Sequence, residues 1–128
     1  MTNALVVDYD IGPPVPAIMD KLLSLGITPK GLPIVTLMEE ISTRHNFYDL
    51  LMIHCNAYNR LDGGFYKPSG RAMERIREWQ EGIVTIGYSP ISPRILNKEY
   101  GNLYDDCLSL SEDLYGRLEG TLKKHKVI

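Results

Sequence analysis

The sequence has little cysteine, no apolar run long enough to cross a membrane and no block of charges of one sign. Its two cysteines, Cys55 and Cys107, are far apart and neither belongs to a CxxC motif, which indicates reduced thiols in a cytoplasmic protein. No apolar stretch approaches the roughly 20 residues that span a bilayer, and Asp8 and Asp10 interrupt the first apolar run early, so we expect neither a membrane anchor nor a signal peptide. With 14 basic and 16 acidic residues the net charge is −2, which gives no general attraction to nucleic acid or to an anionic membrane.

What is present is the composition of an ordinary folded domain. Of 128 residues, 44% are hydrophobic and 23% are charged, which predicts one domain over residues 1–128 with a continuous core. The chain contains no internal repeat, linker or low-complexity segment.

Short apolar stretches alternate along the chain with segments of helical periodicity. The strands are expected within residues 4–7, 27–35, 49–53, 83–86 and 103–110. The second holds two prolines and a glycine, which favours a sheet edge. Residues 36–39 read as a capping box for a helix that buries Leu37, Met38 and Ile41. The alternation predicts an α/β fold: a three-layer, doubly wound, five-stranded parallel sheet of order 2-1-3-4-5, as in flavodoxin-like proteins.

Polar side chains follow the expected strands at one edge of this sheet. In doubly wound sheets, ligands bind beyond the carboxyl ends of the strands, at the switch point between the first and third strands. The residues expected around this crevice are Asp8, Tyr9, Asp10, His54, Cys55, Asn56, Gly87, Tyr88, Ser89, Leu110 and Ser111.

These strand ends, together with residues 48–78, resemble the receiver domain of two-component response regulators. In residues 48–78 a strand is followed by a loop containing Asp62-Gly63 and by a helix ending in Arg-Ile-Arg-Glu. The resemblance covers nearly the whole chain and implies a phosphoacceptor aspartate, two adjacent acids that hold Mg²⁺, a hydroxyl residue after the fourth strand and a lysine after the fifth.

The residues at those positions depart from the receiver pattern. His54 stands where the aspartate is expected, and Tyr9 stands beside Asp8 in place of the second acid. Gly87 falls at the hydroxyl position, which Ser89 could fill only with a two-residue shift, and Leu110 falls at the lysine. The chain is therefore interpreted as a degenerate pseudo-receiver without cofactor or aspartyl phosphate, and the residues favour a non-enzyme.

Two alternatives remain open for the same crevice. Asp8, Asp10 and His54 could bind Zn²⁺ or Mn²⁺, as in a small metal- or anion-dependent enzyme or a ligand-binding protein, although paired acids at strand ends often only cap backbone amides. Phosphoryl transfer onto His54 itself is the third hypothesis.

Aromatic and basic residues indicate a protein partner, with a homodimer as one form of it. The long loop after the third strand, and the face that receivers use for partners (fourth helix, fifth strand, fifth helix), are the expected surfaces. The candidate residues are Tyr58, Arg60, Phe65, Tyr66, Lys67, Tyr88, Tyr100 and Tyr104. Packing of the same rings against the sheet or within the core is the alternative.

Overall fold

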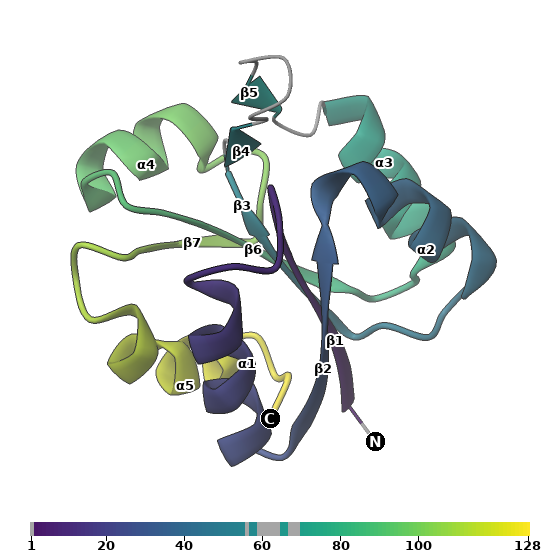
Figure 1. Ribbon diagram of the computed structural model, residues 1–128, viewed down its shortest axis with the longest axis horizontal. Coiled ribbons are helices and arrows are strands. Elements are labelled where there is room, and N and C mark those ends of the chain that lie inside the picture. The colour runs from purple at the N-terminus through teal and green to yellow at the C-terminus, as the bar shows by residue number, and fades with distance from the viewer. Residues whose placement is uncertain (1, 56, 59–64, 67–69) are drawn as a thin grey trace.

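A computed structural model describes residues 2–55, 57–58, 65–66 and 70–128 of the chain, and its centre is a five-stranded parallel sheet (Figure 1). The strand order is β2-β1-β3-β6-β7, and every neighbouring pair is parallel. The strands are β1 Thr2–Asp8, β2 Ile27–Pro33, β3 Leu50–His54, β6 Val84–Ser89 and β7 Asp106–Ser109. This confirms the predicted fold class and order.

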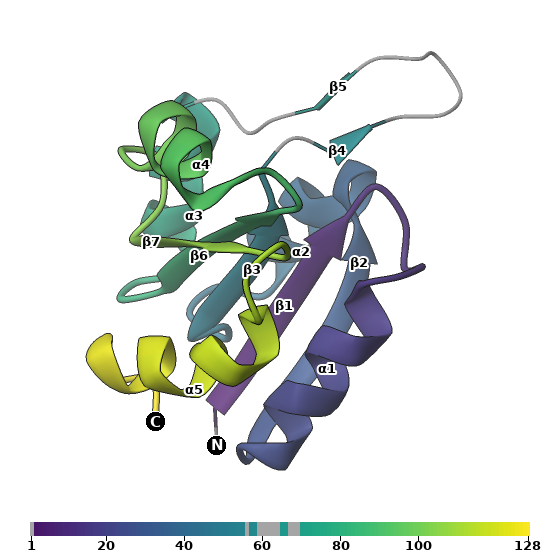
Figure 2. The same ribbon diagram turned by 90° about the vertical axis from the view of Figure 1, so that its left-hand side faces the viewer.

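Helices cover both faces of the sheet. They are α1 Val15–Ser24, α2 Leu37–Thr43 after the short 3-10 helix η1 Ile34–Thr36, α3 Gly70–Trp79, α4 Pro93–Tyr100 and α5 Leu114–Lys124. Figures 1 and 2 show α1 and α5 together on one face and α2, α3 and α4 on the other. The buried residues accordingly fall into two clusters, one on each side of the sheet.

The alternation of side chains along each strand assigns every sheet residue to one of these faces. Val6, Met52 and Tyr88 belong to the cluster beneath α1 and α5. Val7 and Ile53 belong to the cluster beneath α2, α3 and α4. Residues two apart on a strand thus share a face, which we call their parity, and parity decides which side chains at the carboxyl edge can meet.

A small second sheet, which the sequence analysis did not predict, follows β3. The strands β4 Ala57–Tyr58 and β5 Phe65–Tyr66 pair in antiparallel fashion, and in Figure 2 they lie outside the main sheet, beyond the carboxyl end of β3. No helix within the described residues is long and apolar enough to cross a membrane.

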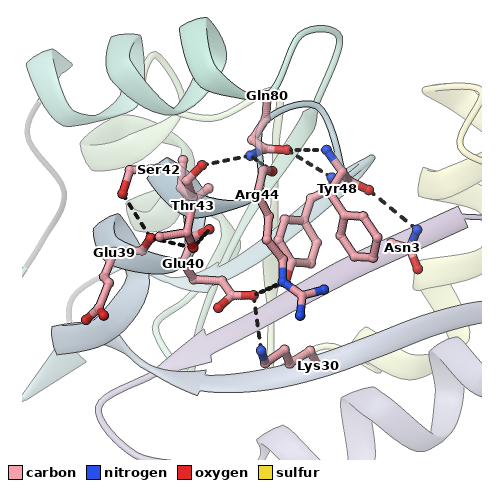
Figure 3. A network of polar contacts seen from close by, with 11 residues as sticks. Asn3, Lys30, Glu39, Glu40, Ser42, Thr43, Arg44, Tyr48 and Gln80 are labelled. Atoms are coloured by element: carbon pink, nitrogen blue, oxygen red, sulfur yellow. Dashed lines mark hydrogen bonds and ion pairs between the residues drawn. The ribbon is translucent and has the colours of Figure 1, made fainter.

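The loop between α2 and β3 is fixed by a buried amide. Gln80, which follows α3, accepts hydrogen bonds from the backbone N–H groups of Phe47 and Tyr48, both at 2.9 Å. Its Nε2 donates to the carbonyl oxygens of Ile41 and Arg44 at 3.0 and 2.6 Å (Figure 3). One side chain thus satisfies four backbone groups.

Candidate functional site

The carboxyl ends of β1 and β3 lie next to each other, as the sequence predicts for the crevice. β1 ends at Asp8 and β3 ends at His54, and the two strands are paired neighbours. β3 pairs on its other side with β6, where the residue next to His54 is Tyr88. Asp8, His54 and Tyr88 have the parity of the sheet face beneath α1 and α5, so these three side chains stand on one side of the sheet at one edge.

Tyr88 fills the space between them. Its side chain is completely buried, and its hydroxyl lies 2.9 Å from Oδ2 of Asp8 and 2.9 Å from the carbonyl oxygen of Val7. Its ring meets the imidazole of His54 edge to face, with 5.5 Å between centroids and 75° between planes. Burial and the adjacent Asp8 carboxylate raise the pKa of Tyr88, so the phenol stays protonated and donates.

The second oxygen of Asp8 is also occupied. Oδ1 accepts the backbone N–H of Tyr9 at 2.6 Å, while Oδ2 receives the Tyr88 hydroxyl. The strand-end acid acts here as an acceptor for protein groups.

Asp10 is turned away from the crevice. It is exposed, and its Oδ1 accepts the backbone N–H of Gly12 at 2.9 Å, which closes the turn after β1. Among residues 2–55, 57–58, 65–66 and 70–128, no three His, Cys, Asp or Glu side chains are grouped so that they could hold a metal ion. The contact with Gly12 is the capping role that the sequence analysis considered for the acids at this strand end.

His54 is half-buried beside Asp8 and Tyr88. Burial lowers the pKa of its imidazole, and the Asp8 carboxylate opposes this shift. The side chain is therefore mainly uncharged at neutral pH. An uncharged imidazole neither replaces the aspartate chemically nor compensates the charge of a phosphoryl group.

Gly87 lies one residue before the position beside His54. It pairs with Ile53 rather than His54, and it faces the side of the sheet beneath α2, α3 and α4. A Cβ atom placed on it would lie 2.6 Å from Sγ of Cys55 and 2.6 Å from Cδ2 of Tyr104. The residue beside His54 is thus Tyr88.

The ends of β6 and β7 are joined by serine hydroxyls. Ser109 donates from Oγ to the carbonyl oxygen of Ile91 at 2.5 Å and lies 2.7 Å from Oγ of Ser111. Oγ of Ser89 accepts the N–H of Ile91 at 3.4 Å. Leu110, at the expected lysine position, is half-buried and packs against the core. These contacts fix the loop after β6 to the end of β7 by neutral groups.

Cys55 and Cys107 contact each other on the sheet face covered by α2, α3 and α4, although they are far apart in sequence. Both are free and buried, and their thiols hydrogen-bond to each other. This bond, together with burial, raises the pKa of the Cys55 thiol. Because Cys55 is protonated and on the face opposite His54, it is no nucleophile for the crevice, as parity predicted.

The three tyrosines expected on a partner surface are not on the surface. Tyr88, Tyr100 and Tyr104 are all buried, so core packing accounts for these rings. The positions of Arg60 and Lys67, and the side chains of Tyr58, Phe65 and Tyr66, lie outside what the structure describes, and their role at an interface stays a prediction.

Sequence reasoning placed Tyr88 at the rim but missed that it fills the crevice. The available signal was the position along the strand: counted from the start of β3 and of β6, His54 and Tyr88 are both the fifth residue, and an aromatic ring at that point is large enough to reach β1. The register itself came only from the structure.

Comparison with known proteins gives a consistent result for the fold. No protein-family model matches the chain, and no curated protein matches its sequence. Solved structures do match. A CheY-like response regulator receiver domain from Methylobacillus flagellatus has a TM-score of 0.73 at 20% identity over 98% of both chains.

Two further solved structures resemble the whole chain. A putative pilus assembly protein, CpaE, from Burkholderia thailandensis has a TM-score of 0.66 at 18% identity over all of both chains. The receiver domain of a sensor histidine kinase from Pseudomonas aeruginosa, with magnesium coordinated in its active-site cleft, has a TM-score of 0.64 at 15% identity over 97% of both chains. The chain therefore has the flavodoxin-like fold of response regulator receiver domains.

Proposed function

We propose that this protein is a receiver-like domain that works without phosphorylation, as a protein-interaction module in a signalling or regulatory assembly. The observation that carries the proposal is the buried Tyr88 side chain, which fills the crevice and donates to Asp8. The fold supplies the signalling context by analogy only, since one fold serves many functions.

The chemistry of phosphoryl transfer supports the same conclusion. Transfer needs a metal ion and a cation to neutralise the charge that develops on the phosphoryl oxygens, and Mg²⁺ requires oxygen ligands in near-octahedral geometry. Here Asp10 is directed to Gly12, Asp8 to Tyr88 and Tyr9, and an apolar residue, Leu110, stands at the lysine position. These contacts support a domain that works without phosphoryl transfer.

The test is labelling by small phosphodonors. The protein is incubated with labelled acetyl phosphate or phosphoramidate and Mg²⁺, beside a conventional receiver as positive control. We expect no incorporated label in the wild-type protein. Label that survives base, is lost in acid and is absent from His54→Ala would instead establish a phosphohistidine and overturn the proposal.

A pair of variants separates the roles of His54 and Tyr88. His54→Asp restores the acceptor carboxylate but leaves the Tyr88 ring in place, so we expect it to stay unlabelled. His54→Asp combined with Tyr88→Thr also empties the crevice and frees Asp8. Label incorporated by the single variant would show that Tyr88 does not close the site.

A further inference from the structure

A hollow of about 200 Å³ lies near the amino ends of β1 and β2, away from the crevice. It is bounded by β1, β2 and the segment that joins α2 to β3. Its lining residues are Asn3, Ala4, Thr28, Pro29, Lys30, Arg44, Phe47 and Tyr48. We call this hollow the β2 groove.

Two cations at the β2 groove are held in place by one carboxylate beneath them. Oε1 of Glu40 lies 3.0 Å from Nζ of Lys30 and 3.3 Å from Nε of Arg44, and it also accepts the hydroxyl of Tyr48 (Figure 3). The Glu40 side chain is 15% exposed, whereas those of Lys30 and Arg44 are 47% and 51% exposed. A molecule that approaches this surface therefore meets the cations before the anion.

The guanidinium of Arg44 is oriented as well as charged. Its central carbon lies 5.1 Å from the centroid of the Phe47 ring, and its Nε is bonded to Glu40. In the part of the chain that the structure describes, its two Nη groups have no acceptor. A guanidinium fixed in this way presents a two-pronged edge that matches a carboxylate.

An apolar wall stands next to this charged edge. The Phe47 side chain is 41% exposed, large for a phenylalanine, and Pro29 and the ring of Tyr48 continue the lining. The nearby acid Asp49 is engaged at the edge of the groove, where its Oδ2 accepts the backbone N–H of Asn3 at 3.0 Å. Exposed aromatic and arginine side chains around a hollow are the usual anchors of protein recognition.

We propose that the β2 groove binds an acidic segment of a partner protein in which a carboxylate stands beside one bulky apolar side chain. The carboxylate pairs with Arg44 and Lys30, and the apolar side chain enters the hollow against Phe47. This names the partner chemistry for the interaction role proposed above. It does not depend on the state of the crevice, because the groove and Tyr88 share no residue.

The experiment uses N-acetyl-phenylalanine, which carries a carboxylate beside one ring, and its uncharged amide, N-acetyl-phenylalaninamide, as the matched probe. Each is titrated into ¹⁵N-labelled protein while the amide signals of residues 28–30 and 44–48 are followed. For a ligand of this size we expect a Kd on the order of 1 mM for the carboxylate. The amide should bind about fivefold more weakly, as should Arg44→Gln or Lys30→Gln with the carboxylate.

Lys98→Gln, on the exposed surface of α4, is the matched control and should bind as the wild type does. Equal affinity for the two probes, or shifts located elsewhere, would overturn the proposal. Shifts of the same signals on concentrating the protein without probe would identify a second copy as the occupant and would also overturn it. Phosphodonor labelling, in contrast, tests the proposed function and leaves the groove unaffected.

Discussion

At the residue scale, the crevice is decided by one side chain. A receiver-like crevice would need two ionised acids and room for a cation, but Tyr88 occupies the room and hydrogen-bonds to the one acid that faces it. A phenol and a carboxylate are complementary as donor and acceptor. Tyr88 and Asp8 therefore form a hydrogen-bonded contact at this edge of the sheet.

The hydroxyl of Tyr88 should contribute measurably to stability. Tyr88→Phe keeps the ring and removes the bond to Asp8, which leaves a half-buried carboxylate with one fewer donor. We expect the free energy of unfolding to fall by about 1–3 kcal/mol, measured by urea denaturation. Tyr115→Phe, on α5, is the control, and an equal loss in both variants would contradict a special role for Tyr88.

The lowered pKa of His54 should make the protein less stable as the pH falls. Burial lowers its pKa below 6.5, so the unfolded chain binds a proton at a higher pH than the folded protein does. The contribution of His54 to the free energy of unfolding is fully present above pH 6.5 and falls as the pH decreases toward the lowered pKa. When unfolding is measured between about pH 7 and about pH 5, the free energy of unfolding should fall less steeply with decreasing pH in His54→Gln than in the wild type. An unchanged or steeper fall would refute the lowered pKa of His54.

Gln80 should contribute strongly to stability, because its side-chain amide bonds to four backbone groups. Gln80→Leu keeps most of the volume but leaves the amides of residues 47 and 48 and the carbonyls of residues 41 and 44 without their partner. We expect a loss of at least about 3 kcal/mol, seen in denaturant or thermal unfolding. Glu78→Gln, exposed on α3, should change stability little; a mild effect of Gln80→Leu would mean that water replaces the amide.

At the element scale, strand parity explains why a hydroxyl residue cannot be restored at Gly87. β6 passes between β3 and β7, and the missing side chain at Gly87 makes room for Cys55 and Tyr104. Gly87→Ser should therefore destabilise the protein by about 1–3 kcal/mol through overpacking. Gly120→Ala, where no atom lies within 4 Å, should stabilise α5 by about 1 kcal/mol instead, and similar effects of both changes in thermal unfolding would contradict this packing.

The start of α2 shows where local sequence signals fail. Residues 36–39 fit a capping box, but the Thr36 hydroxyl donates to the carbonyl oxygen of Pro33 at 2.9 Å and makes no cap. The chain enters α2 through the 3-10 helix η1 instead. Met38, expected in the core, is exposed, while Leu37 and Ile41 are buried as predicted. The entry path rotated the helix relative to the simple pattern.

At the scale of the whole molecule, the order of strands followed from the sequence because short apolar strands alternating with amphipathic helices permit few topologies. The convergence of Asp8 and His54 followed from the same rule. The contents of the crevice did not, since they depend on the register between β3 and β6, and a shift of one residue moves every side chain to the other face. The pair β4 and β5 was missed because its strands are only two residues long.

Both edges of the sheet are unsuited to pairing with another strand. β2 carries Pro29 and Pro33, which lack N–H groups and lie on the same face of the strand. In β7, the backbone N–H of Cys107 donates to Oδ1 of Asp106 at 2.9 Å. Prolines and self-bonded groups of this kind protect edge strands. A partner is therefore expected to contact side-chain surfaces such as the β2 groove.

The central claim, that Tyr88 closes the crevice to the metal and the phosphoryl group, is tested most directly by adding Mg²⁺ with beryllofluoride and following the amide signals of Asp8, His54 and Tyr88. We expect no saturable shifts and no rise in melting temperature for the wild-type protein. Saturable shifts at these three residues, with a higher melting temperature, would contradict it.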